Sequence, residues 1–282
     1  MEQLQEKMDV IGNNIANTNT TGYKSARVTF EDSFSQTLRA STPANATAGN
    51  TSALQIGSGV VTGAIQSDFT QGISAQTNNP DNLFIDGNGF FMVRDPISGE
   101  QFATRSGEFH FDTQGFLVTD GSFFRVQGYS EAAALATPDT VNTSTIGDIM
   151  RDTADRNSPL TAYSIDKQGR IRVTVDDPSI ATFTRGQVLL QNFKDPLALV
   201  KEGNNLYSGI IAAGPLGGGT PQPAAAQTNG LGTIRSGFVE LSNVDLASQF
   251  ADLIITQRSF QASARVITTS DEMLQETVNL KR

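Results

Sequence analysis

The strongest hydrophobic pattern of the chain lies near its C-terminus, where apolar residues recur at a fixed spacing. Every seventh position of one series is apolar: Leu246, Leu253, Phe260, Ile267 and Leu274. A second series, four residues after the first, is apolar only in part: Phe250, Gln257, Ala264, Asp271 and Val278. This spacing is typical of a long helix whose narrow apolar stripe meets another helix. We therefore predict a C-terminal helix, with Ser242 or Asn243 as its N-cap.

The N-terminus repeats the helical pattern over a shorter length. Its apolar residues follow one another in steps of three and four: Met1, Leu4, Met8, Ile11 and Ile15. A single helix of this length is only marginally stable in water, so it needs a partner to cover its apolar face. We expect it to pair with the C-terminal helix as a coiled coil. The alternative is two independent surface helices on one globule.

Between the two ends the pattern changes to short alternating runs, which indicate β-strands. The run "NLFIDGNGFFMV" places Asp86-Gly87-Asn88-Gly89 between two apolar segments and predicts a hairpin, because Gly and Asn tolerate positive φ. Two further hairpins are predicted at the similar Asp-x-Gln-Gly turns of residues 112–115 and 166–169. The expected fold class is α+β, with paired terminal helices and an inserted, mostly antiparallel β domain.

Two stretches of low complexity separate the ends from the middle. Residues 39–54 and 212–230 are rich in Gly, Pro, Ala, Ser and Thr, and hold few large apolar side chains. The sequence therefore predicts three parts. Residues 1–38 and 240–282 form the terminal helical domain, 39–75 and 212–239 form extended connectors, and 76–211 form a β-rich outer domain.

Composition narrows the classes of function. The formal net charge is -9, which disfavours nucleic acid and anionic membranes as partners because both attract concentrated positive charge. The chain has no Cys and a single His, so thiolate chemistry and Cys-based metal sites are excluded. No apolar run is long enough for a membrane span, and no signal peptide opens the chain.

No set of residues in the sequence predicts catalysis. His110 lies between Phe109 and Phe111 in a predicted strand, on the face opposite the Phe side chains, where solvent contact is expected. Gly87 and Gly89 are not followed by a helix start, as a phosphate-binding loop requires. We expect no enzyme activity, no catalytic residues, no cofactor and no metal.

Three separated motifs carry a resemblance to a known family. "MDVIGNNIANTNTTGYKSARVTFED" is similar to the N-terminal signature of bacterial flagellar axial proteins, which build the rod, the hook and the hook-associated structures. "NLFIDGNGFFMV" with "TRSGEFHFDTQGFLVTDGS" resembles the β core of hook and distal rod proteins. The ending "TTSDEMLQETVNLKR" looks most like that of hook proteins, with distal rod proteins second. The large outer insertion of many hook proteins is reduced here to a small loop, at about 131–159.

This resemblance implies how the ends work. In the family the two terminal helices pair as a coiled coil that lines a tube. The residues that would form this self-assembly seam are Leu4, Met8, Ile11, Ile15, Leu246, Phe250, Leu253, Phe260, Ile267, Leu274 and Val278. The Asn-rich turn would join the helix to the outer domains, with side chains that cap and bridge backbone groups. The residues of this junction motif are Asn13, Asn14, Asn17, Asn19 and Gly22, the last at a possible positive φ.

The function that the sequence favours is a structural subunit of the flagellar hook, which polymerises into a hollow helical tube and transmits motor torque. The alternative is a distal rod subunit of the basal body. A third hypothesis, from a different class, is a β-rich extracellular adhesin or accessory module. The resemblance implies that its partners are further copies of itself, the rod, hook-cap and hook-filament junction proteins, and the flagellar type III export apparatus. It also implies an extracellular place in the flagellum, after export without a signal peptide.

Overall fold

The computed structural model describes residues 1–41, 52–130, 146–151, 160–176, 182–216, 223–228 and 230–280. The chain forms two compact units. The helical unit comprises Met1–Ala16, Ser25–Asp68 and Val244–Arg282, and the β unit comprises Asn17–Lys24 and Phe69–Asn243. Each unit therefore contains residues from both halves of the chain. The fold is α+β, as the sequence predicts.

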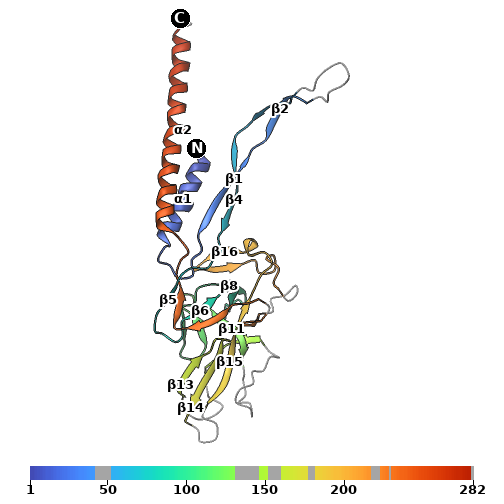
Figure 1. The fold of residues 1–282 in the computed structure, drawn as a ribbon, viewed down its shortest axis with the longest axis vertical. Coiled ribbons are helices and arrows are strands. Elements are labelled where there is room, and N and C mark those ends of the chain that lie inside the picture. The colour runs from blue at the N-terminus through green and yellow to red at the C-terminus, as the bar shows by residue number, and fades with distance from the viewer. Residues whose placement is uncertain are drawn as a thin grey trace. The chain divides into compact units, whose positions relative to one another are not determined.

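The helical unit holds both α-helices of the described residues. The short helix α1 (Glu2–Ala16) and the long helix α2 (Leu246–Leu280) lie side by side (Figure 1). Strand β1 (Ala26–Asp32) pairs antiparallel with β4 (Val60–Ser67), and β2 (Ser35–Arg39) pairs with β3 (Leu54–Gly57). Helix α1 also packs against β1 and β4. The packing of the two helices is thus observed, while a regular coiled coil remains a prediction.

The N-terminus of α2 differs from the sequence prediction by a few residues. The carboxylate of Asp245 accepts a hydrogen bond from the Ala247 amide at 3.0 Å, and the Asp245 carbonyl accepts one from the Gln249 amide at 3.0 Å. Asp245 therefore caps the helix, and the prediction of Ser242 or Asn243 was wrong. A carboxylate is a preferred cap because it also interacts favourably with the positive end of the helix dipole.

The β unit is built from short antiparallel strands. In chain order they are β5 (Ser74–Gln76), β6 (Leu83–Asp86), β7 (Phe90–Arg94), β8 (Gln101–Thr104), β9 (Phe109–Phe111), β10 (Leu117–Thr119), β11 (Arg125–Ser130), β12 (Ile146–Asp148), β13 (Leu160–Ile165), β14 (Arg170–Val175), β15 (Thr182–Gln191), β16 (Val200–Gly203), β17 (Leu206–Ser208), β18 (Ala224–Ala225), β19 (Thr233–Ser236) and β20 (Phe238–Glu240), with a short 3-10 helix η2 (Pro196–Ala198). The main sheet has the order β13-β14-β15-β11-β7-β8-β17-β16. Two smaller sheets pair β6 with β19 and β5 with β20.

The two Asp-x-Gln-Gly turns form the predicted hairpins by the same device. The Asp112 carboxylate accepts hydrogen bonds from the amides of Gln114 and Phe116 at 2.9 and 2.8 Å. The Asp166 carboxylate does the same with Gln168 and Arg170, at 3.0 and 2.9 Å. The glycine that ends each turn has a positive φ, +84° and +77°. These local signals were sufficient to predict β9–β10 and β13–β14.

The predicted hairpin at residues 86–89 is absent. Strand β6 pairs with β19, whereas β7 pairs with β8, β11 and β15. Gly232 explains this arrangement, because a Cβ there would lie 2.3 Å from the Asp86 carbonyl oxygen. The backbone of the C-terminal half approaches so closely that β6 has a distant partner in place of its neighbour. The glycines of this segment redirect the chain between two sheets.

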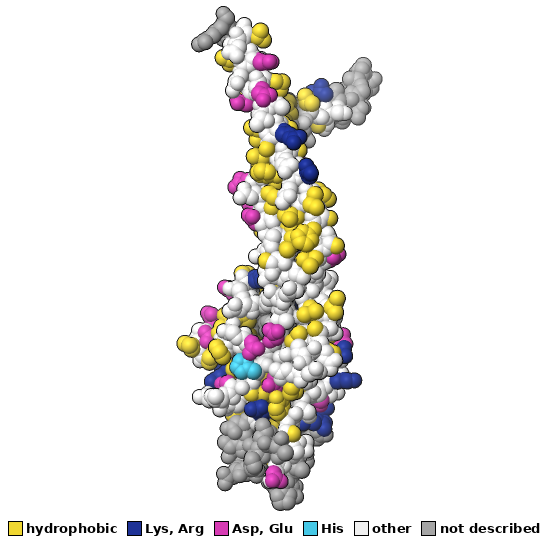
Figure 2. All heavy atoms as spheres, turned by 90° about the vertical axis from the view of Figure 1, so that its left-hand side faces the viewer, with side chains coloured by type: hydrophobic (Ala, Val, Ile, Leu, Met, Phe, Trp, Pro, Cys, Tyr) yellow, Lys and Arg dark blue, Asp and Glu magenta, His cyan; other side chains and the backbone are white. Residues whose placement is uncertain are grey.

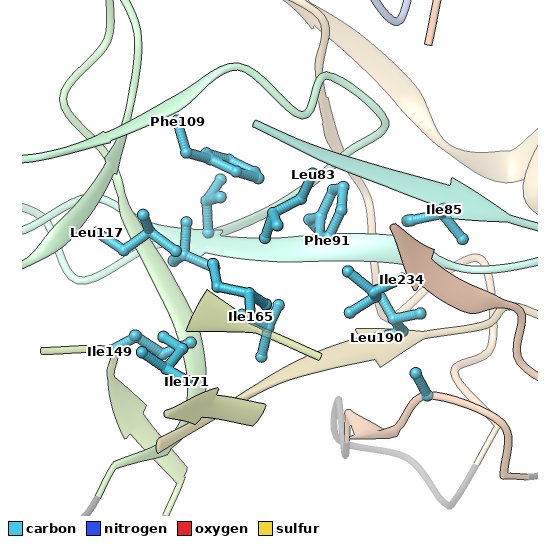
Figure 3. Packing of buried hydrophobic residues seen from close by; sticks show 14 of the residues in the cluster. Leu83, Ile85, Phe91, Phe109, Leu117, Ile149, Ile165, Ile171, Leu190 and Ile234 are labelled. Carbon is cyan, nitrogen blue, oxygen red and sulfur yellow. The ribbon is translucent and has the colours of Figure 1, made fainter. Parts of the chain in front are cut away.

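The core of the β unit lies between these sheets. Its buried side chains include Leu83, Ile85, Phe91, Phe109, Leu117, Ile149, Ile171, Leu190 and Ile234. They come from segments distant in sequence and point toward one another (Figure 3). The rings of Phe91 and Phe109 meet edge to face at 5.1 Å, a favoured aromatic geometry. Burial of this apolar surface is the main stabilising contribution to the unit.

Strands occupy much of the sequence that was expected to form extended connectors. Residues 39–75 contain β3 and β4, and residues 212–239 contain β18 and β19. These segments are poor in large apolar groups, but their backbones pair with other strands, and ladder hydrogen bonds do not depend on side-chain size. Residues 42–51 of the first low-complexity stretch, and 131–145 and 152–159 of the expected insertion, lie outside the described residues.

Candidate self-assembly surface and its junction

The apolar stripe of α1 faces the rest of the helical unit. Ile11 is buried, and Leu4, Met8 and Ile15 are half-buried. The helix packs against α2 on one side and the β1–β4 pair on another. All four residues predicted for the seam on this helix are thus at least partly covered within one subunit.

Helix α2 contacts its surroundings through a stripe that differs in part from the predicted one. Of the first heptad series, Leu253 and Phe260 are half-buried, whereas Leu246 is 40% exposed. The second inward row is Gln249, Thr256 and Ser263, with Thr256 only 2% exposed. Two members of the predicted row, Phe250 and Gln257, are exposed. Phe250 is therefore not covered within one subunit, and its place in the assembly seam stays a prediction.

Sequence reasoning missed Thr256 and Ser263 because it searched for apolar side chains. The hydroxyl of Thr256 donates to the carbonyl of Asp252 at 2.7 Å, and that of Ser263 to the carbonyl of Ser259 at 3.0 Å. Each hydroxyl is satisfied within its own helix, so burying it carries little penalty. Small residues on this row also let another backbone approach α2 closely. The spacing of Ser and Thr at a heptad interval is the signal that could have found them.

Beyond Ala264 the described residues of α2 are all exposed. Three seam residues lie there, Ile267, Leu274 and Val278, with exposed fractions of 56%, 64% and 65%. Ile267 and Leu274 continue the series of Phe260 at heptad spacing, and Val278 belongs to the second series. Helix α1 is shorter than α2 and ends its contact before this region (Figure 1). A long stretch of predicted seam is therefore uncovered in a single subunit.

The exposed apolar surface of α2 is not confined to the seam. Ile254, Ile255, Val266 and Met273 are between 58% and 64% exposed and lie on other sides of the helix. Hydrophobic side chains are visible along the helical unit in Figure 2. A helix that is apolar on several sides is typical of one that becomes buried in a larger structure.

The junction after α1 depends on Asn14, which is 1% exposed. Its side-chain amide donates to the Ala26 carbonyl at 2.8 Å and to the Gln249 side chain at 3.0 Å. Its side-chain oxygen accepts a hydrogen bond from the Ala26 amide at 2.9 Å. One residue of α1 therefore binds the edge of β1 and the first turns of α2. This is the bridging of backbone groups expected of the Asn-rich turn.

The other junction residues have more local roles. The Asn17 side chain accepts a hydrogen bond from the Thr20 hydroxyl at 3.1 Å, while Asn13 and Asn19 are exposed. Gly22 has a φ of +69°, so the expected positive φ is confirmed. Its amide donates to the carbonyl of Glu240 at 2.7 Å. The turn is thereby joined to the last strand of the β unit.

Two residues of this turn were missed by the sequence analysis. Tyr23 and Lys24 are both buried, and the Lys24 ammonium lies 2.6 Å from the Glu240 carboxylate. The ammonium of Lys201 lies over the ring of Tyr23, 3.8 Å from its centre. A charged residue at the end of a polar turn is normally solvated, so nothing local predicted its burial.

The single histidine and the acidic residues of the described part of the chain do not gather into a metal-binding cluster. The side chain of His110 is 36% exposed and pairs with the carboxylate of Asp120 at the surface. No group of three or more His, Asp or Glu residues in the described ranges is arranged to hold a metal ion. Among the described helices, none is both long and apolar enough to cross a membrane.

Comparison with known proteins matches three parts of the chain to models of flagellar rod and hook proteins. Residues 1–24 match the family model "Flagella basal body rod protein", residues 84–173 match "Flagellar hook protein FlgE/F/G D1 domain", and residues 235–280 match "Flagellar basal body rod FlgEFG protein C-terminal". The chain is 38% identical over 282 residues to the flagellar basal-body rod protein FlgG of Bacillus subtilis, covering all of this chain and 96% of that protein. It is 32% identical over 283 residues to the FlgG of Borreliella burgdorferi, again with 96% of that protein covered.

Similarity to a hook protein is weaker. The flagellar hook protein FlgE of Borreliella burgdorferi is 25% identical over 444 residues, with 97% of that protein covered. The relatives that the chain matches are structural proteins of the flagellar rod and hook. The chain belongs to the flagellar rod and hook protein family, and it is an axial structural component of the bacterial flagellum.

Proposed function

We propose that this chain is a subunit of the flagellar distal rod, in preference to the hook subunit that the sequence favoured. The observation that carries the proposal is the pattern of identity along the whole length. Rod proteins named FlgG align at 38% and 32% identity over nearly the same number of residues as this chain. The hook protein reaches 25% only over a much longer alignment.

The proposed mechanism of polymerisation uses the terminal helices. Copies of the chain would cover the exposed part of the seam on α2, where Ile267, Leu274 and Val278 leave apolar surface in water. Contacts between unlike surfaces of identical subunits generate an open helical assembly, so a hollow tube is the expected product. Burial of apolar area would provide the free energy of association.

The partners of such a subunit follow from its place in the tube. They would be further copies of the chain, the adjoining rod and hook proteins, and the export apparatus that delivers the unfolded chain. The hook-cap and hook-filament junction proteins expected from the sequence would be partners only if the chain is a hook subunit.

Electron microscopy of purified flagella tests the proposal. A short epitope inserted at Ile97, which is 94% exposed in the turn between β7 and β8, gives an accessible label. Gold label on the rod of isolated hook–basal bodies is the expected result. Label along the hook would instead establish the hook subunit. Label on the cell surface, away from the flagellum, would favour the adhesin hypothesis.

A further inference from the structure

A group of buried charges joins both ends of the chain inside the β unit. The Glu240 carboxylate lies 2.6 Å from the Lys24 ammonium and 3.5 Å from the Arg105 guanidinium, with side-chain exposures of 1% for Glu240, 1% for Lys24 and 4% for Arg105. It also accepts a hydrogen bond from the Gly72 amide at 2.8 Å. Three separate segments therefore meet at one carboxylate.

Each cation of this group has a backbone acceptor as well. Lys24 donates to the Thr70 carbonyl at 2.7 Å, and Arg105 donates to the Gly87 carbonyl at 3.0 Å. Burial lowers the pKa of Arg105, and the nearby charge of Glu240 acts in the opposite direction. A buried cation loses its hydration, and a well-placed carboxylate is what offsets that cost. Glu240 is thus the group on which the burial of Arg105 depends most.

Hydrogen bonds also hold the backbone of the N-terminal turn, residues 17–24, in this region of the β unit. The Gly22 amide donates to the Glu240 carbonyl at 2.7 Å, and the Asn205 side chain donates to the Thr21 carbonyl at 2.7 Å. Strand β20, which carries Glu240, pairs with β5 through Glu240 and Ser74. Glu240 therefore contacts the N-terminal turn, β5 and the segment that follows β8.

We propose that Glu240 closes a completion latch: the β unit reaches its stable state only when this residue docks among Lys24, Arg105 and Gly72. Glu240 stands near the end of the β unit in chain order and just before α2. Because a chain is synthesised from its N-terminus, Lys24 and Arg105 are present before Glu240. The turn at residues 17–24 stays accessible until Glu240 is present, so a chain that ends before Glu240 lacks its latch.

The rate of trypsin cleavage after Lys24 tests the latch in the full chain, because trypsin cuts after lysine and needs this residue to be accessible. In the wild-type protein Lys24 is buried, and cleavage between Lys24 and Ser25 should be slow. Glu240→Gln removes the charge while keeping the size, so cleavage at this bond should become at least about 10-fold faster, and Tm should fall by about 10 °C. Glu100→Gln, at an exposed position, is the matched control and should match the wild type.

Unchanged cleavage after Lys24 in Glu240→Gln would overturn the latch. If Glu240→Gln does not fold, Glu240→Asp decides, because it keeps the charge and shortens the side chain by one methylene. Cleavage after Lys24 that is slower in Glu240→Asp than in Glu240→Gln supports the latch. Equal cleavage in the two variants shows that the charge of residue 240 does not close the latch. In the double variant Lys24→Met, Glu240→Gln, the loss in Tm should be smaller than the sum of the two single losses. An additive loss contradicts the charge coupling.

Refolding kinetics test whether Glu240 docks last. A contact absent from the folding transition state affects the unfolding rate alone. Glu240→Gln should therefore unfold faster, with a folding rate within about twofold of the wild type. A folding rate that falls as much as the unfolding rate rises would mean that Glu240 docks early, and the proposed order would be wrong.

Discussion

Gly22 leaves no space for a side chain at the junction. Its φ is +69°, and a Cβ there would lie 2.5 Å from the amide nitrogen of Ser106. Real Cβ atoms do not approach a backbone this closely, so any substitution must displace one of the two segments. Gly121 offers a matched comparison, since its φ is +85° but nothing lies within 4 Å of its Cβ position.

We expect Gly22→Ala to lower the free energy of unfolding of the β unit by about 3 kcal/mol or more, because strain and overlap add. Gly121→Ala should cost about 1 kcal/mol, because only the positive φ is unfavourable. Urea unfolding followed by circular dichroism measures both. Equal losses would mean that the turn at residues 17–24 moves freely away from Ser106.

Asp148 is a second residue whose environment sets a measurable property. Burial by itself raises its pKa, but hydrogen bonds from Gln127, Arg94 and Arg125 outweigh burial and lower it below its ordinary value. The two guanidinium groups lie 2.6 and 3.1 Å from one carboxylate oxygen. A carboxylate whose pKa is lower in the folded state contributes stability above its unfolded pKa of about 4, and this stability is lost as the pH falls through the folded pKa.

Asp148→Asn should therefore lower the Tm at pH 7, and its difference from the wild type should shrink as the pH falls below about 4. The reason is that the wild-type carboxylate becomes protonated there and loses its ion pairs. Thermal unfolding over a series of pH values measures the difference. A gap that stays constant down to about pH 2 would show that the pKa of Asp148 is not lowered in the folded protein.

At the scale of elements, α1 depends on its surroundings more than on its own sequence. It spans only Glu2–Ala16, a length at which an isolated helix is marginal. Asn14 joins it to β1 and α2 through hydrogen bonds of 2.8 to 3.0 Å. This single amide links a helix, a strand and a second helix, all within the helical unit.

Asn14→Leu should release α1, because it leaves the amide and carbonyl of Ala26 without their partner. We expect a loss of about 2–4 kcal/mol in the protection of α1, measured by amide hydrogen exchange. Gln5→Ala, at an exposed position of the same helix, should change protection by no more than about 0.5 kcal/mol. If α1 keeps its protection in Asn14→Leu, apolar packing alone holds the helix.

At the scale of the whole molecule, α2 is the element that one subunit leaves incomplete. Leu274 is 64% exposed, so replacing it does not remove packing within the subunit. Leu274→Asp should keep the wild-type Tm but fail to polymerise, because assembly would bury a carboxylate in an apolar contact at a cost of several kcal/mol. Sedimentation or negative-stain microscopy measures the polymer.

Thr268→Asp is the control for this change, since Thr268 is exposed on the same helix and outside the seam. It should polymerise to a similar extent as the wild type. Tubes formed equally well by both variants would remove Leu274 from the proposed assembly surface, and polymerisation would have to use another part of the chain.

The sequence by itself determined the features that depend on residues close together along the chain. The heptad spacing of Leu253 and Phe260 predicted α2, and the Asp-x-Gln-Gly turns predicted two hairpins because their hydrogen bonds are made within five residues. Gly22 could be expected at a positive φ because glycine has no Cβ. The motifs at the two ends were sufficient to identify the family.

Only the tertiary structure decided which distant segments pair. It gave β6 the partner β19 instead of β7, placed the polar Thr256 on the buried side of α2, and brought Glu240 to Lys24 from the far end of the chain. The first and the last depend on a second segment that compensates a group unfavourable by itself, an unpaired strand edge or a charge, whereas the Thr256 hydroxyl is satisfied within its own helix and needs a second segment only to cover it. Such a cost is local and visible in the sequence, whereas the group that offsets it is known only once the chain has folded.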